Sequence, residues 1–111
     1  EGALPTFNIG TNSGASCDPR IEKAAAEACA RAGDDYTHVV NGRFKGGWTT
    51  RHYGKPSQNV HAIQMELAQR AYMTEAPPWG YDETKAQRLR SVLAEILGAI
   101  EKFAMEGTPS A

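Results

Sequence analysis

Two segments of the chain space their apolar residues as amphipathic helices do. The first starts at Asp18 and Pro19, a typical helix start, and ends at Gly33. The second follows Asp82, another suitable N-cap, and runs for about 20 residues. Its apolar stripe consists of Leu89, Val92, Leu93, Ile96, Ile100 and Phe103. The spacing predicts two helices that each bury one face.

Between the helices lie segments with the β-branched and apolar content of strands. We predict strands at Phe7 to Ile9, at residues 36–42 and at Val60 to Leu67. The glycine-rich stretch "NGRFKGGWTTRHYGKP" predicts a loop with an extended piece around Trp48 to Arg51. The order strand, helix, strand, extended loop, strand, helix predicts an α/β fold, with helices packed against a sheet.

The composition is that of an ordinary globular chain. The 111 residues suit one domain, and 41% are hydrophobic and 23% charged. A formal net charge of −1 gives no general attraction to nucleic acid or anionic lipid. No apolar run approaches the roughly 18 residues of a membrane span. We therefore expect neither nucleic acid nor a membrane as partner.

The ends of the chain and its cysteines bear on whether the chain is a fragment and on its cellular location. The sequence starts with Glu1 and lacks an initiator Met, and its small sheet would suit a fragment of a larger α/β domain. The tail, residues 107–111, is expected to be disordered. Cys17 and Cys29 are too few for a disulfide framework. We expect a reducing, cytoplasmic location.

Glu66 stands out in the third predicted strand. Alternation puts Ile63, Met65 and Leu67 on one face of that strand, and Gln64 and Glu66 on the other. A buried carboxylate must be paired, protonated or facing a cavity, because an unpaired buried charge is costly. Two interpretations stay open on the residues alone. The carboxylate is either at a strand end or paired with an arginine, or it is a catalytic general base or metal-linked acid.

The glycine-rich loop is the second candidate site. It carries Arg43, Lys45 and Arg51 among aromatic residues, and guanidinium groups can grip carboxylates or phosphates in bidentate fashion. The loop is therefore a candidate for anion binding. The alternatives are an exposed hairpin, or stacking on single-stranded nucleic acid, against which the slightly acidic chain argues.

The remaining reactive side chains predict no complete site. The three histidines lack the spacing of a metal site. Cys17 precedes a predicted helix N-terminus, which could lower the pKa of its thiol, although a small packed residue is the simpler interpretation.

Four segments, in this order, resemble a known family: "FNIGTNSGASC", "HVVNGRFKGGWTTRHYGKP", "NVHAIQMELAQRAYM" and "PPWGYDE". Together they are similar to the C-terminal part of the N-formylglutamate deformylase (N-formylglutamate amidohydrolase) family, enzymes of histidine degradation. The resemblance runs from about Leu4 to Phe103.

The resemblance implies a fold, a reaction and roles for residues. The family hydrolyses N-formyl-L-glutamate to L-glutamate and formate. Its fold is a three-layer α/β/α sandwich resembling zinc-dependent exopeptidases (phosphorylase/hydrolase-like), of which residues 1–111 would be the C-terminal portion. By resemblance, Glu66 is the general base acting on a metal-bound water. The substrate carboxylates would be held by Arg51, Arg43 and Lys45.

The chain also departs from the family. The family's metal-ligand histidines lie in its N-terminal half, in a Pro-His-x-Gly-type and an Asp-x-His-Ser-type segment, and neither occurs in this sequence. We therefore expect zinc, or another divalent metal, with ligands outside this chain, and the missing N-terminal part of the same enzyme as partner. Alone, the chain is expected to be inactive. The alternative is a small non-enzymatic binding module for acidic ligands or single-stranded nucleic acid.

Overall fold

The computed structural model describes residues 4–33, 35–74, 77 and 80–106. Its elements are, in order, β1 (Phe7–Gly10), α1 (Pro19–Arg31), β2 (His38–Val40), α2 (Trp48–Tyr53), β3 (Gln64–Leu67) and α3 (Glu83–Glu106). Two short 3₁₀ helices, η1 (Pro56–Gln58) and η2 (Gln69–Ala71), flank β3. The fold is mixed α/β, as predicted.

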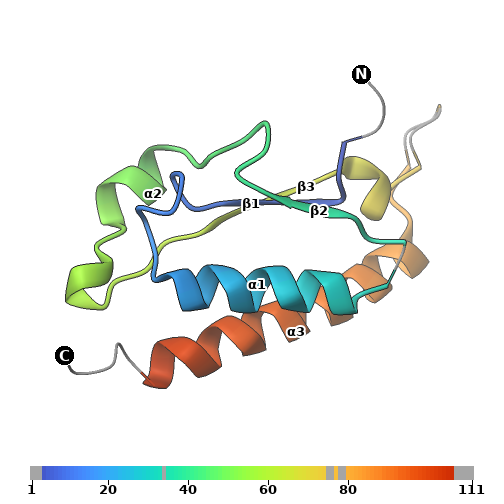
Figure 1. Ribbon diagram of the computed structural model, residues 1–111. Helices are drawn as coiled ribbons and strands as arrows, with labels where there is room; N and C mark the ends of the chain where they lie inside the picture. The colour runs from blue at the N-terminus through green and yellow to red at the C-terminus, as the bar shows by residue number, and fades with distance from the viewer. Residues whose placement is uncertain (1–3, 34, 75–76, 78–79, 107–111) are drawn as a thin grey trace.

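The three strands form one sheet with β1 in the middle. The order is β2-β1-β3, with β1 parallel to β2 and antiparallel to β3. Helix α1 connects the parallel pair, as a parallel pair requires a crossover. Helices α1 and α3 lie side by side on one side of the sheet, and the chain after β2 leaves toward the other side and reaches α2 (Figure 1). One face of the sheet is thus left for a loop rather than a helix layer.

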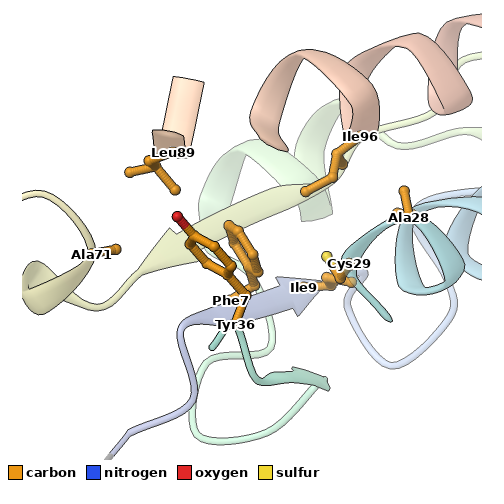
Figure 2. Packing of buried hydrophobic residues seen from close by; sticks show 9 residues of the cluster. Phe7, Ile9, Ala28, Cys29, Tyr36, Ala71, Leu89 and Ile96 are labelled. Atoms are coloured by element: carbon orange, nitrogen blue, oxygen red, sulfur yellow. The ribbon is translucent and has the colours of Figure 1, made fainter. Parts of the chain in front are cut away.

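The hydrophobic core lies between the sheet and the two long helices. Phe7 and Ile9 of β1 are fully buried there, and the ring of Phe7 stacks on Tyr36 with centroids 5.7 Å apart (Figure 2). Leu89 and Ile96 of α3 enter the same core. The remaining hydrophobic side chains that pack against it include Ile63, Met65, Leu67, Val92, Leu93 and Ile100. The predicted inward face of β3 and most of the α3 stripe are therefore confirmed as core.

The predicted ends of the helices are confirmed as well. The Asp18 side chain accepts a hydrogen bond from the backbone N–H of Arg20 at 2.8 Å. Gly33 follows α1 with φ of +102°, a conformation that favours glycine. The Asp82 side chain accepts from the backbone N–H of Lys85 at 3.0 Å, at the start of α3. Local capping chemistry thus fixes where both helices begin.

The predicted extended piece at Trp48 to Arg51 is wrong, because these residues belong to helix α2. Their β-branched and aromatic side chains favour a strand, but tertiary contacts decide. Thr50 is buried, and its hydroxyl donates to the carbonyl of Gly47 at 2.8 Å. A Cβ at Gly46 would lie 2.5 Å from that hydroxyl oxygen, so the helix needs glycine there.

Two predicted strands are longer than the observed ones. In place of residues 36–42, β2 covers only His38–Val40. In place of Val60 to Leu67, β3 begins at Gln64. Residue Val60 instead bridges to Lys55, and Ala62 donates its N–H to the carbonyl of Ser16 at 2.9 Å. Residues 60–63, the first half of the predicted strand, therefore lie outside β3, and Val60 and Ala62 make their backbone hydrogen bonds to other segments.

Some expectations fall outside the described residues. These are the tail at 107–111 and parts of the proline-rich stretch before α3, residues 75–76 and 78–79. Within the described part, none of the helices combines the length and the apolar character needed to cross a membrane.

Candidate active site

The sheet face opposite the helices carries polar side chains. Because Phe7 and Ile9 point into the core, Asn8 of β1 points the other way. Asn8 pairs in register with Glu66 of β3, and Gly10 pairs with Gln64. A cleft of about 640 Å³ opens on this face. Its lining includes Asn8, Arg43, Phe44, Glu66, Gln69 and Arg70.

Residues 41–47, which we call the cover loop, lie across this face. A Cβ at Gly10 would be 2.8 Å from the backbone nitrogen of Gly46, so the loop rests directly on β1. The Asn8 side chain donates to the carbonyl of Phe44 at 2.5 Å and accepts from its N–H at 3.3 Å. These contacts bring Arg43, the neighbour of Phe44, to the cleft that Glu66 also lines.

The start of the cover loop is fixed by Asn41. Its side-chain oxygen accepts from the N–H of Thr11 at 2.9 Å, and its amide nitrogen donates to the hydroxyl of Thr11 at 2.8 Å. The Thr11 hydroxyl in turn donates to the carboxylate of Glu22 on α1 at 2.6 Å. Thr11 is buried, so this network ties the loop to the body of the fold.

Glu66 is half-buried and bonded to Gln64 rather than to an arginine. The amide nitrogen of Gln64 donates to Oε1 of Glu66. No ion pair to Glu66 and no partner of its Oε2 occurs among the residues that the structure describes. The structure therefore gives no support to pairing with an arginine, and one carboxylate oxygen remains available in a cleft.

The three predicted cationic residues are separated. All three are exposed, but only Arg43 lines the cleft with Glu66, and Lys45 and Arg51 are absent from the described lining. Lys45 contributes its backbone carbonyl, which accepts from the N–H of Asn12 at 2.7 Å, and Arg51 lies on α2. The roles of Lys45 and Arg51 as substrate contacts stay predictions.

Two residues of the cleft were missed from the sequence. Arg70 lines the cleft and donates to the hydroxyl of Thr6 at 3.3 Å. The sequence signal that could have identified Arg70 is its position four residues after Glu66. For Asn8 the sequence offered no signal. Its pairing with Glu66 depends on the register between two strands whose paired residues are 58 positions apart (66 minus 8).

The described residues do not assemble a metal site. In that part of the chain, no group of three or more His, Cys, Asp or Glu side chains could hold an ion. His61 has a structural position, since its Nδ1 accepts from the N–H of Asp18 at 3.0 Å and its Nε2 bonds to Asn59 at 2.9 Å. Zinc, expected from the resemblance, has no ligand set among these residues.

Both thiols are buried, so the preferred interpretation of Cys17 as a small packed residue is confirmed over an activated thiol. Burial, together with the nearby charges of Glu22 and Asp18, raises the pKa of Cys17 to about 11. Burial alone raises the pKa of Cys29 to about 11. The proximity of the helix N-terminus does not offset the loss of hydration.

We predict that neither thiol reacts readily in the folded protein. With a pKa near 11, only about one thiol in 10³ is ionised at pH 8, and the thiolate is the reactive form. Ellman's reagent should therefore release little colour at pH 8 until denaturant is added, and then titrate both cysteines. Rapid reaction without denaturant would contradict the buried positions.

Comparison with known proteins identifies relatives along nearly the whole chain. The family model for N-formylglutamate amidohydrolase matches residues 1–73. N-formylglutamate deformylase from Pseudomonas aeruginosa is 51% identical over 96% of this chain and 40% of its own length. The Pseudomonas putida protein of the same name is 49% identical over 96% of this chain and 39% of its own length.

A solved structure supports the fold. The crystal structure of N-formylglutamate amidohydrolase from Ralstonia eutropha JMP134 superposes with a TM-score of 0.75 at 23% identity. The match covers 91% of this chain and 35% of that one. The chain thus spans about 40% of the length of the curated relatives it matches. With a family model covering residues 1–73, the chain belongs to the N-formylglutamate amidohydrolase family.

Proposed function

We propose that this chain is the C-terminal portion of an enzyme that hydrolyses N-formyl-L-glutamate, and that it supplies one part of the active site. The observation that carries the proposal is the shared cleft. Glu66 on β3 and Arg43 on the cover loop, 23 residues apart by their numbers, line the same hollow on the sheet face opposite the helices. A glutamate and an arginine that line one cleft suit the hydrolysis of an anionic amide.

Glu66 is proposed as the general base and acid. It takes a proton from the water that attacks the formyl carbon. It then gives that proton to the amide nitrogen as the C–N bond breaks, so that formate and the amine of glutamate leave. The Oε2 atom, without a partner among the described residues, suits this role. Such proton transfer contributes about 10²- to 10⁴-fold in rate.

Arg43 is proposed as a contact to a substrate carboxylate. N-formyl-L-glutamate carries two carboxylates, and the fork of an arginine can hold one of them with two parallel hydrogen bonds. No ion pair of Arg43 occurs among the described residues, so its guanidinium is available for a ligand. Its place in the cleft favours it over Lys45 and Arg51.

The rest of the enzyme would complete the site. We propose that a divalent metal, zinc by family resemblance, is held by residues outside this chain. Proton transfer by Glu66 and carboxylate binding by Arg43 do not depend on which metal that is. The second helix layer of the three-layer sandwich is likewise proposed to come from the remainder of the domain, since α1 and α3 both cover one face (Figure 1).

An assay of the intact enzyme that contains this chain tests the function. We expect release of formate from N-formyl-L-glutamate. We also expect no salt-dependent gel shift with a single-stranded oligonucleotide. Trp48 stacks on His52 with ring centroids 4.2 Å apart, so one face of its ring is already covered. Oligonucleotide binding without formate release would instead favour the non-enzymatic binding module.

A further inference from the structure

We infer that Gln64 is a positioning residue that orients the carboxylate of Glu66 by tying it to the backbone of the cover loop. This inference rests on the proposed role of Glu66. It concerns the amide of Gln64, whose two ends make two different hydrogen bonds. The oxygen accepts from the N–H of Gly47 at 2.6 Å, and the nitrogen donates to Oε1 of Glu66.

The orientation of this amide follows from its partners. A backbone N–H is only a donor, so the atom facing Gly47 must be the amide oxygen. The amide nitrogen then faces Glu66, whose ionised carboxylate is only an acceptor. A flipped amide would set donor against donor at Gly47. Gln64 therefore occupies one carboxylate oxygen of Glu66 and leaves the other, Oε2, available for proton transfer.

The position of Gly47 is itself fixed. Its carbonyl accepts from the hydroxyl of the buried Thr50 at 2.8 Å. The neighbouring Gly46 lies against Gly10, the register partner of Gln64, where a Cβ would come within 2.8 Å of the loop backbone. Because position 10 is glycine, the cover loop packs closely enough on β1 for the N–H of Gly47 to reach the Gln64 side chain.

These contacts form a continuous series from α2 to the catalytic candidate. Thr50 holds Gly47, Gly47 holds Gln64, and Gln64 holds Glu66. The carboxylate is therefore oriented relative to the loop that carries Arg43. Because the Gln64 side chain is held at both ends, it restricts the rotamers that Glu66 can adopt before substrate binds.

Two variants of the intact enzyme test the inference. Gln64→Leu removes both hydrogen bonds, and Gln64→Glu keeps an acceptor for Gly47 but places a second carboxylate beside Glu66. We expect each to lower kcat at least about tenfold, the lower end of the effect of losing one hydrogen bond to a charged group, with KM changed less than about threefold. The matched control is Gln58→Leu on η1, an exposed position outside the described lining, which should leave kcat unchanged.

A double-mutant cycle separates positioning from a structural role. If Gln64 acts through Glu66, then adding Gln64→Leu to Glu66→Gln should lower kcat by less than about threefold. A full tenfold loss in that background, or an unchanged kcat in both single variants, would overturn the inference. Thermal unfolding of each variant shows whether it folds. If Gln64→Leu does not fold, the kcat of Gln64→Glu tests the inference. Failure of the proposed function can be told apart from failure of this inference. If Glu66 is not the general base, the Glu66→Gln variant alone retains normal turnover.

Discussion

Replacing Glu66 by Gln in the intact enzyme should lower kcat for N-formyl-L-glutamate by at least about 10²-fold, because an amide cannot carry the proton that the carboxylate transfers. KM should change little, since the substitution preserves the shape of the side chain and leaves Arg43 in the cleft lining unchanged. Measuring the initial rate of formate release over a range of substrate concentrations separates the two constants.

The matched control for this prediction is Glu101→Gln, which removes the same charge from an exposed position on α3. It should leave both constants at the wild-type values. Since Glu66 is not proposed as a metal ligand, the Glu66→Gln enzyme should also keep the wild-type metal content. Near-normal turnover in Glu66→Gln would remove this residue from the mechanism.

The second large effect is expected at Arg43. Replacing it by Ala should lower kcat/KM by about 10- to 100-fold, mainly through KM, because a charge-assisted hydrogen bond to the substrate carboxylate is lost. The loss should be smaller for N-formyl-L-glutamine, in which a neutral amide replaces the side-chain carboxylate, if Arg43 holds that carboxylate.

Arg51→Ala and Lys45→Ala provide the comparison for Arg43→Ala. Each removes one positive charge close to Arg43 in sequence, but neither residue belongs to the described cleft lining. Their effects on KM should therefore be smaller than that of Arg43→Ala. A larger effect at Arg51 would mean that the substrate carboxylate lies toward α2 and not beside Glu66.

The sequence was sufficient for the features that depend on local contacts. Helix α1 follows from Asp18 and Gly33, and α3 follows from Asp82 and an apolar stripe, because caps and periodicity act over a few residues. The outward position of Gln64 and Glu66 follows from simple alternation along β3.

The features that depend on distant contacts could not be predicted. Helix α2 forms where Thr50 packs against Gly46, although its residue types favour a strand. The pairing of Asn8 with Glu66, and the seating of the cover loop on Gly10, depend on register between segments far apart in the chain. For this reason the sequence predicted one common site for Arg43, Lys45 and Arg51. Only the fold shows that Arg43 alone of the three lines the cleft.

The most direct test of the central claim is a crystal structure of the intact Glu66→Gln enzyme with N-formyl-L-glutamate bound. We expect the substrate in the cleft between β3 and the cover loop, with its formyl group beside position 66 and a carboxylate on the guanidinium of Arg43. Substrate bound elsewhere, with this cleft empty, would contradict the account.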